Sequence, residues 1–579
     1  MLRELLKCIG QYKRDSLLSP VFVVLEVVLE VLIPFLMAYL IDYGIELGDL
    51  SMIISLGSAL ILTALISLVF GVLSGHYAAR ASAGYARNLR KKMFESVQDF
   101  SFYNLDKFSS ASLVTRLTTD VTNIQNAYQM IIRVAVRSPI MLFFSLLMSF
   151  SINRKLSLVF LGIAPFLVLG LYLIIKNAHP IFRTVFKTYD KLNNVVQENL
   201  RGIRVVKSFV REDYEKEKFH AVSENIFRNF SKAEKILAFN GPLMQFSMYV
   251  SMLLISWFGA KMIVSATLTT GQLVSFISYS AQILMSLMML SMVFVMIAIS
   301  RASAERIVEV LREKSDLSNC EEPVLTVKNG EIRFEEVSFS YAKKADSYSL
   351  KGINLTIKAG ETVGIIGGTG SSKTTLVQLI PRLYDVTEGA VYLGGVDVRK
   401  YDLRVLREQV AVVLQKNELF SGTIKENLRW GNKEASEEEL IQVCQLAQAD
   451  EFIKSFPEGY DTYLEQGGTN VSGGQKQRLC IARALLKKPK VLILDDSTSA
   501  VDTKTDALLR QGLRQSLPET TKLIIAQRVA SIREADRIVV MHEGQIAAVG
   551  THEELLQTNQ IYQEVYYSQQ KGGDSPDVA

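Results

Sequence analysis

Six long apolar runs limit what this chain can fold into more than any other feature does. They cover residues 16–41, 50–75, 138–152, 156–175, 237–260 and 273–300. A helix of about 20 apolar residues crosses the roughly 30 Å of membrane hydrocarbon, where every backbone polar group needs an internal partner. The third run is short, and the apolar stretch 128–136 around Arg133 predicts that its helix begins earlier. We therefore expect an all-α domain with six spans in a lipid bilayer.

The segments between the spans indicate how the helices are oriented. The two long ones, after the second and fourth spans, are rich in basic residues, namely Arg87, Arg90, Lys91, Lys92 and Arg116, then Arg183, Lys187, Arg201, Arg204, Lys207 and Arg211. Basic residues favour the cytoplasmic side, so the long segments would be cytoplasmic and the short links external. Only Arg154 and Lys155, which lie in a short link, depart from this rule. This pattern predicts a multi-pass protein of the cell membrane with both termini in the cytoplasm. Residues 1–15 read as an amphipathic lead-in helix, not a signal peptide.

The composition indicates that a soluble part follows the membrane part. The 579 residues are too many for one core, and 21% of them are charged although 49% are apolar. The net charge of +5 is small and the basic residues are spread out, which argues against a nucleic-acid partner. Four scattered cysteines fit reduced thiols without a metal site. We expect a membrane domain (1–314), a polar linker (315–330), a soluble α/β domain (331–566) and a disordered tail (567–579).

A phosphate-binding loop is the first sign of chemistry in the α/β part. Residues 332–341 and 353–367 read as strands, and the second leads into GGTGSSKTT, followed by the start of a helix. Backbone N–H groups of such a loop hold phosphates, Lys373 reaches the β/γ oxygens and Thr374 can bind Mg²⁺. The loop differs from the usual phosphate-loop pattern at one position, where Ser372 replaces a glycine. The predicted phosphate-binding residues are Gly367, Gly368, Thr369, Gly370, Ser371, Ser372, Lys373, Thr374 and Thr375.

The segment VLILDDSTSAVD, residues 491–502, predicts a buried strand that carries a carboxylate to the edge of a sheet. Asp495 would hold Mg²⁺ there beside the phosphates. Together with VSGGQKQR at 471–478, Gln415 and SAVD at Ser499–Asp502, the chain resembles the nucleotide-binding domain of the ATP-binding cassette (ABC) family. With six preceding spans it looks like an ABC exporter half-transporter. The resemblance is closest to one subunit of the heterodimeric bacterial multidrug exporters.

The resemblance implies a role for each matching residue, with ATP and Mg²⁺ as the cofactors. Tyr341 matches the aromatic residue that stacks on adenine, and Gln415 matches the glutamine between Mg²⁺, water and the membrane domain. The signature segment contributes Ser472, Gly473, Gly474 and Gln475 to an ATP held by a second subunit. Asp502 completes the predicted catalytic set of Asp496, Gln527, Gln415 and Asp502, and the predicted metal ligands are Thr374, Gln415 and Asp495.

Two positions depart from the family in the same direction. The family's water-aligning glutamate is Asp496 here, and its switch histidine is Gln527. The shorter carboxylate retreats by about 1.5 Å, and a misplacement near 1 Å can cost about 100-fold in rate. We predict that this chain's own site binds ATP but hydrolyses it slowly, and that its signature segment completes an active site on a different second subunit. The alternative is a homodimer that works with aspartate.

The expected function is ATP-driven export of hydrophobic or amphipathic compounds. Residues 102–109 and 209–214 resemble the family's two coupling helices, the second usually docking on the partner. Glu26 and Glu30 lie one helical turn apart in the first span, and they read equally as a surface for cationic compounds or as a pairing between helices. Methionine rows in the last two spans favour ordinary packing over a promiscuous cavity. An ATP-gated channel, a regulatory subunit, or a homodimeric lipid or peptide exporter are alternatives.

Overall fold

The computed structural model describes residues 1–342, 347–497 and 500–571, and the chain forms two compact units. The first comprises Met1–Gln98 and Ser110–Glu313, and the second comprises Asp99–Ser109 and the chain from Lys314 onward. The first unit is helical and the second is α/β, which confirms the predicted fold class. The short segment Asp99–Ser109, which we placed in the membrane domain, groups with the α/β unit instead.

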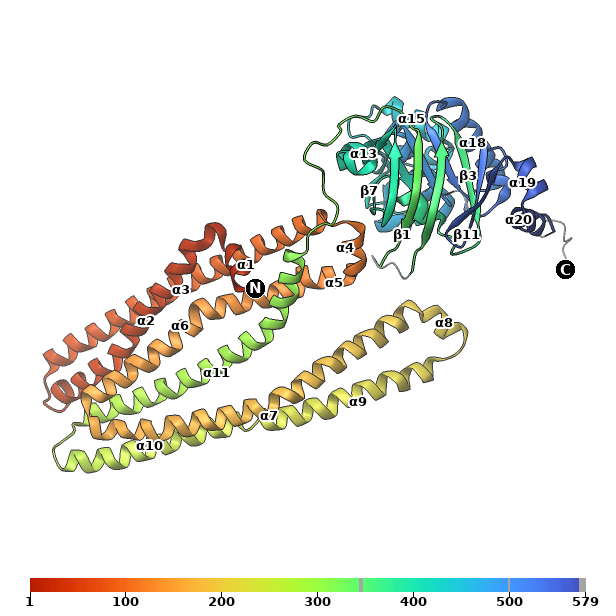
Figure 1. Ribbon diagram of the computed structural model, residues 1–579. Coiled ribbons are helices and arrows are strands. Elements are labelled where there is room, and N and C mark those ends of the chain that lie inside the picture. Colours follow the sequence, from red (N-terminus) through yellow and green to blue (C-terminus); the bar gives the residue numbers. More distant parts are fainter. Residues whose placement is uncertain (343–346, 498–499, 572–579) are drawn as a thin grey trace. The chain divides into compact units, whose positions relative to one another are not determined.

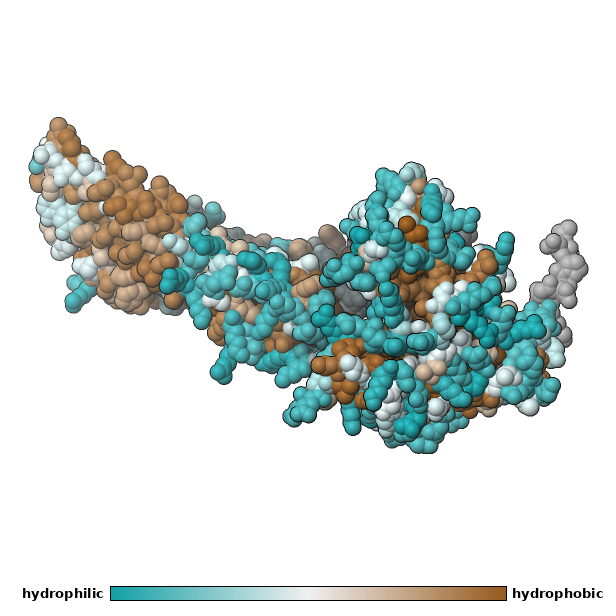
Figure 2. All heavy atoms as spheres, turned by 90° about the horizontal axis from the view of Figure 1, so that it is seen from above, coloured by the Kyte–Doolittle hydropathy of each residue, from teal (hydrophilic) through white to brown (hydrophobic). Residues whose placement is uncertain are grey.

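The described part of the first unit contains ten α-helices, two short π-helical segments and one 3-10 turn at Gly10–Tyr12. The α-helices and π-helical segments are α1 (Leu2–Lys7), α2 (Lys13–Tyr39), η2 (Leu40–Ile45), α3 (Leu50–Gln98), α5 (Ser110–Thr115), η3 (Arg116–Asp120), α6 (Val121–Ile152), α7 (Arg154–Arg201), α8 (Ile203–Ser208), α9 (Glu212–Leu237), α10 (Asn240–Val264) and α11 (Thr270–Arg312). Among the described residues, six helical segments are long and apolar enough to cross a membrane, as predicted. The third begins well before residue 138, and Figure 2 shows an apolar belt on the helical unit.

The helices of the first unit pack through small residues. Helices α2, α3, α6 and α11 lie side by side, and α10 contacts α11 and α7 (Figure 1). Buried serines allow close approach, because a hydroxyl can bond across a helix pair: Ser19 donates to the Ser74 carbonyl at 3.1 Å, and the Ser251 and Ser280 hydroxyls lie 2.6 Å apart. Helices α7 and α9 form a hairpin whose tip is α8.

The two glutamates of the first span are paired with a cation on another helix. Arg137 of α6 donates to Glu26 at 2.6 Å and to both carboxylate oxygens of Glu30 at 2.7 and 2.6 Å. This arrangement favours a structural role for Glu26 and Glu30 over a binding surface for cationic compounds. One guanidinium group can donate to two carboxylates that lie one helical turn apart. The triad therefore ties α2 to α6 within the membrane.

The methionine rows are only partly packed within this chain: Met244 contacts the core, whereas other members are exposed. Met285, Met289 and Met292 of α11 are 63%, 41% and 61% exposed. On α10, Met248 and Met252 are also exposed. The apolar neighbours that bury α11 contact its other face, where Phe276, Ile283 and Leu284 lie in the core. The methionines are thus available to lipid, to a second subunit or to a cavity.

The second unit contains three sheets and the remaining helices. Its strands are β1 (Ile332–Phe339), β2 (Leu350–Ile357), β3 (Thr362–Gly367), β4 (Glu388–Leu393), β5 (Val396–Asp397), β6 (Val410–Val413), β7 (Gly422–Thr423), β8 (Tyr463–Leu464), β9 (Val491–Asp495), β10 (Thr521–Ile525), β11 (Arg537–His542) and β12 (Gln545–Gly550). Its helices are α4 (Phe102–Lys107), α12 (Lys373–Gln378), α13 (Leu403–Gln409), α14 (Ile424–Leu428), α15 (Glu437–Leu446), α16 (Asp450–Ser455), α17 (Gly473–Leu485), α18 (Thr503–Ser516), α19 (His552–Thr558) and α20 (Gln560–Lys571).

The largest sheet has the order β12-β11-β3-β10-β9-β6. Strands β11, β3, β10, β9 and β6 run parallel, and β12 is antiparallel at the edge. All residues of β9 and β10 are buried, because helices cover both faces of a parallel sheet. The stretch 353–367 contains the end of β2 and all of β3, not one strand. A turn separates them at Gly360, whose φ of +78° suits glycine.

The segments expected as linker and tail are partly ordered on the α/β unit. Leu317 is buried, and the Asn319 amide donates a hydrogen bond to the Asp402 carboxylate at 2.5 Å. Val324 forms an isolated β-bridge with Tyr401. The linker therefore follows the surface of the second unit. Helix α20 continues to Lys571, so residues 567–571 are helical where we expected disorder, and residues 572–579 lie outside the described part of the chain.

The glutamate–arginine triad predicts a large loss of stability when Arg137 is removed. Arg137→Met leaves two neighbouring carboxylates without their shared cation, and breaking a buried pair in this way costs about 3–5 kcal/mol. We expect a clearly lower unfolding temperature for the detergent-solubilised protein. Arg133→Met, one turn away on α6, is the matched control, because no ion pair of Arg133 occurs among the described residues. Equal shifts from the two variants would contradict a stabilising triad.

Candidate functional site

The predicted phosphate and metal residues meet at one edge of the parallel sheet. The phosphate loop follows β3, Gln527 follows β10, Asp495 ends β9 and Gln415 follows β6, and these four strands are neighbours. Parallel strands present their carboxyl ends on one side, where open α/β sheets bind ligands. The pocket there is lined by Ile366, Gly367, Gly368, Thr369, Gly370, Ser372, Lys373, Thr374, Thr375, Gln415, Asp495, Asp496, Ile525, Gln527 and Val565.

The phosphate loop curls around the ammonium group of Lys373. This group donates to the carbonyl oxygens of Gly367 and Gly368 at 2.9 and 2.8 Å, and to the Ser371 hydroxyl at 3.2 Å. Burial lowers the pKa of Lys373. Ser372, which replaces the usual glycine, has a φ of +67°. Its backbone therefore keeps the left-handed conformation in spite of the Cβ.

Oxygen donors suited to Mg²⁺ lie beside the loop. The Thr374 hydroxyl donates to Asp495 at 3.1 Å, and Asp495 is almost completely buried at the end of β9. Burial raises the pKa of Asp495 and of its neighbour Asp496. A hydroxyl and a carboxylate at this position form an all-oxygen donor set, which is what Mg²⁺ prefers. Thr374 and Asp495 therefore fit the predicted ion, with Gln415 in the lining of the same pocket.

The two residues that depart from the family pattern contact each other. The Gln527 side-chain N–H donates to Asp496 at 2.7 Å. Gln415 also hydrogen-bonds the Asp496 carboxylate, which therefore lies between two glutamine side chains. Asp496 has a φ of +47°, a conformation that aspartate tolerates better than most residues. The short carboxylate is thus fixed from two sides, by the strands β6 and β10.

The predicted adenine-stacking residue belongs to an aromatic cluster beside the loop. Tyr341 is 40% exposed and its hydroxyl lies 3.0 Å from that of Thr375. Its ring meets Phe339 and Tyr384 edge-on, with centroids 4.8 and 5.2 Å apart. Tyr384 donates to Asp106 of α4 at 2.7 Å, so the first predicted coupling segment contacts this cluster.

The signature residues and Asp502 do not line the pocket of their own chain. Ser472 begins α17 through a capping box, in which its hydroxyl accepts from the Gln475 N–H and the Gln475 side chain accepts from the Ser472 N–H. Ser472 and Gly473 are exposed, so this end of the helix is accessible to a second subunit. Asp502 caps α18 by accepting from the Thr505 N–H at 2.9 Å. Ser499 lies outside the described residues.

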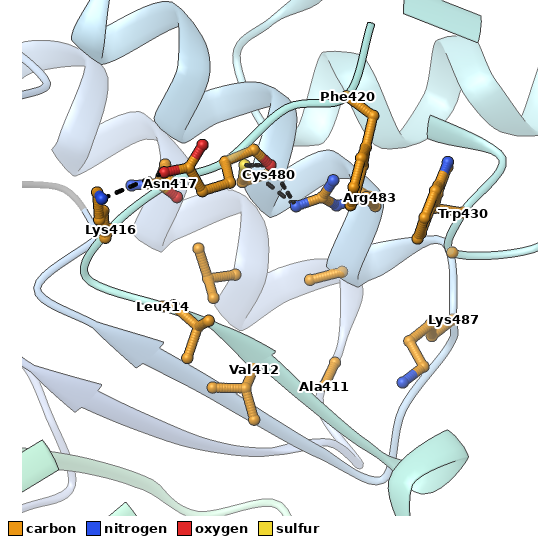
Figure 3. Close-up of a pocket in the computed structure, with 14 residues that line it drawn as sticks. Ala411, Val412, Leu414, Lys416, Asn417, Phe420, Trp430, Cys480, Arg483 and Lys487 are labelled. Carbon is orange, nitrogen blue, oxygen red and sulfur yellow. Dashed lines mark hydrogen bonds and ion pairs between the residues drawn. The ribbon is translucent and has the colours of Figure 1, made fainter. Parts of the chain in front are cut away.

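A second pocket is formed by β6 and the chain that follows it (Figure 3). Its floor is β6, with Ala411, Val412 and Leu414, and its wall is the ring of Phe420 stacked on Trp430 at 4.0 Å. Arg483 donates to the Glu418 carbonyl and contacts Cys480. Trp430 is 63% exposed. We call this pocket the aromatic groove. A protein segment docked in it would lie against β6, the strand that Gln415 follows in the sequence.

Comparisons with known proteins agree with these two units. The model of the ABC transporter transmembrane region matches residues 16–302, and that of the ABC transporter matches residues 350–499. The chain is 38% identical over 514 residues to YfiB of Bacillus subtilis (strain 168), an uncharacterised ABC transporter ATP-binding protein, with 89% of each chain covered. The chain belongs to the ABC transporter family. Its second unit is therefore the ATP-binding domain of an ABC transporter.

Two further relatives place this ABC transporter among fused membrane and ATP-binding chains. It is 34% identical over 505 residues to the ATP-dependent lipid A-core flippase of Desulfotalea psychrophila, covering 86% of this chain and 87% of the flippase. The structure of a bacterial Atm1-family ABC exporter with ATP bound has the same fold, with a TM-score of 0.83, 24% identity and coverage of 97% and 99%. The exporter fold is thus shown for nearly the whole chain.

Sequence reasoning missed three residues near the site. Val565 of α20 lines the nucleotide pocket, Tyr384 joins the adenine-side cluster to α4, and Gln569 contacts the chain around Gln527. Val565 and Gln569 lie at the end of the chain in a stretch without a recognisable motif. Only the packing of α20 brings them to the site.

The left-handed Ser372 predicts a stabilising substitution. Ser372→Gly removes a penalty of about 1–2 kcal/mol for a Cβ in this conformation and adds about 0.5–1 kcal/mol of unfolded-chain entropy. We expect a net gain of roughly 1 kcal/mol in the unfolding free energy of the ATP-binding domain, measured by thermal unfolding of the full chain. Thr369→Gly, in the same loop but without a positive φ, is the control and should give no gain. A loss in Ser372→Gly would contradict strain at this residue.

Proposed function

We propose that this chain is one half of a heterodimeric ABC exporter of the cell membrane, which moves hydrophobic or amphipathic compounds outward with the energy of ATP. Its own site binds ATP and hydrolyses it slowly, while its signature segment completes an active site on the second subunit. The single observation that carries this proposal is the contact between Asp496 and Gln527 at 2.7 Å.

The geometry of Asp496 supports slow hydrolysis. A general base must lie within hydrogen-bond reach of the attacking water, in the right orientation. Asp496 is one methylene shorter than glutamate, so its carboxylate lies farther from the attacking water, although Gln415 and Gln527 keep it oriented. Gln527 also cannot supply the positive charge of an imidazolium. The phosphate loop and the Mg²⁺ donors are nevertheless complete, so binding is retained where turnover is weak.

The signature segment supports a role on the other subunit. The exposed N-terminus of α17 combines a serine hydroxyl with free backbone N–H groups, which favours a phosphate group. Because Ser472 does not line its own pocket, the phosphate it contacts belongs to another chain. A partner with glutamate and histidine at the two altered positions would then have the fast site.

Two exposed surfaces fit each other as a coupling contact between subunits. The turn between α8 and α9 carries Phe209 and Val210, which are 73% and 81% exposed, with Tyr214 beside them. Val210 adopts a φ of +52°, unusual for a β-branched residue, and this turns its side chain outward. We propose that this tip docks in the aromatic groove of the second subunit. Movement of the helices would then reach Gln415 through β6.

The substrate is proposed to be amphipathic. The flippase relative acts on a lipid, and the exposed methionines of α10 and α11 give this chain an adaptable apolar surface. Glu26 and Glu30 both form ion pairs with Arg137. They therefore do not provide two free carboxylates for binding a cationic drug. Lipid-like compounds therefore fit better than small cations. A regulatory subunit remains the second candidate, favoured by the same Asp496–Gln527 contact, and vesicle uptake of substrate would exclude it.

The unequal sites predict unequal effects of two substitutions. Ser472→Ala should remove most of the ATPase activity of the co-purified assembly, at least about tenfold, because it removes a phosphate contact from the fast site. Asp496→Asn should change activity less than about twofold, since the slow site contributes little. Ser436→Ala removes a similar capping box from α15, away from both sites, and controls for lost helix capping. Equal losses of ATPase activity in Ser472→Ala and Asp496→Asn would contradict the heterodimer. High ATPase activity of this chain purified alone would also contradict it.

The coupling contact predicts that Trp430→Ala separates ATP binding from transport. Truncating a stacked aromatic at the centre of an interface costs about 2 kcal/mol or more, which is roughly 30-fold in docking. Transport into inverted vesicles should fall at least about fivefold while ATP affinity stays unchanged. Phe209→Ala should behave alike, and Tyr463→Ala, an exposed aromatic on β8, is the control. Normal transport in both variants would refute docking at this groove.

A further inference from the structure

The last helix of the chain is anchored in the core of the ATP-binding domain. Tyr562 of α20 is completely buried, and its hydroxyl lies 2.7 Å from a ring nitrogen of His552 on α19. The Tyr562 N–H donates to Asn559, and Gln563 donates to the Leu556 carbonyl at 2.7 Å. These contacts fix the first half of α20, so the second half extends from a rigid base.

The second half of α20 carries one side chain to the loop that follows β10. We call residues 526–531 the switch loop. The Gln569 side-chain N–H donates to the Gln527 carbonyl at 2.7 Å, and its carbonyl oxygen accepts from the Val529 N–H at 2.9 Å. The Gln569 amide therefore makes hydrogen bonds to the backbone on both sides of Arg528, to the carbonyl of Gln527 and to the N–H of Val529. This pair of bonds fixes the path of the switch loop at the residue whose side chain holds Asp496.

The rest of the switch loop is held at its two ends. The Ala526 N–H donates to the Ile365 carbonyl of β3, and the Ser531 hydroxyl donates to Asp506 of α18 at 3.0 Å. Gln527 and Arg528 between them are exposed. The contact from Gln569 is therefore made at the middle of the loop. Val565, one turn earlier on α20, lines the nucleotide pocket itself.

We propose that Gln569 is a positioning residue for ATP turnover: it holds the switch loop so that the Gln527 side chain is placed on Asp496. It acts through the backbone and does not touch the nucleotide. The effect falls on this chain's own site, because both of these Gln569 hydrogen bonds go to the switch loop beside Asp496. This inference rests on the proposed function only in assigning that site slow turnover.

The test isolates the slow site in the co-purified assembly. Ser472→Ala silences the fast site, and the residual ATPase then reports on the site of this chain. In that background, Gln569→Ala should lower kcat about 5- to 20-fold, the loss expected from two hydrogen bonds, with KM unchanged within about twofold. Hydrogen exchange at the Val529 amide should become faster in the same variant, because this N–H donates to Gln569.

Matched variants separate positioning from mere stability. Gln563→Ala removes a comparable side-chain bond from α20 without touching the switch loop, and should leave kcat unchanged. Gln569→Glu keeps an acceptor for Val529 but loses the donor to Gln527, so the Val529 amide should stay protected while kcat falls. In a Gln527→Ala background, Gln569→Ala should have no further effect on kcat. An unchanged kcat in Gln569→Ala, or an equal drop in Gln563→Ala, would overturn the proposal.

Failure of the proposed function gives a different result. If Asp496→Asn removes as much ATPase activity as Ser472→Ala does, the two sites are alike and the heterodimer is refuted. The kcat of Gln569→Ala with Ser472 intact then reports on both equal sites, and the same 5- to 20-fold fall is expected. Faster exchange at Val529 without any change in kcat would overturn the positioning role in either assembly.

Discussion

The parallel register of β3, β10, β9 and β6 is the constraint on which the ATP site depends. Four strands that are far apart in the sequence end at one edge, and each places one functional segment there. The strands are buried on both faces, so their apolar side chains fix the register, and a slip would displace the phosphate loop from Asp495. The chemistry of the site is therefore only as precise as the packing of the sheet.

The site shows how two altered residues can act together. Asp496 and Gln527 both depart from the family pattern, and in the fold the Gln527 amide donates to the Asp496 carboxylate. A shorter acid and a neutral amide thus form a complementary hydrogen-bonded pair. The same domain presents its signature segment away from its own nucleotide pocket.

Two aromatic surfaces of the ATP-binding domain lie next to polar residues of the site. The aromatic groove is formed on β6, the strand that precedes Gln415, and the cluster of Tyr341 and Tyr384 connects to Asp106 of α4. Aromatic side chains lose little conformational entropy when they dock, so they transmit position well. In the membrane, the guanidinium of Arg137 has a similar fixing role between α2 and α6.

The sequence by itself determined the six spans and the α/β domain and predicted the phosphate loop, because hydrophobic length and a glycine-rich loop between strand and helix are local properties. It could not decide whether Glu26 and Glu30 are free or paired, since Arg137 lies more than 100 residues away. Nor could it show that Gln527 meets Asp496 or that Gln569 reaches the switch loop. Those contacts depend on which strands are neighbours and where α20 packs, and only tertiary structure sets both.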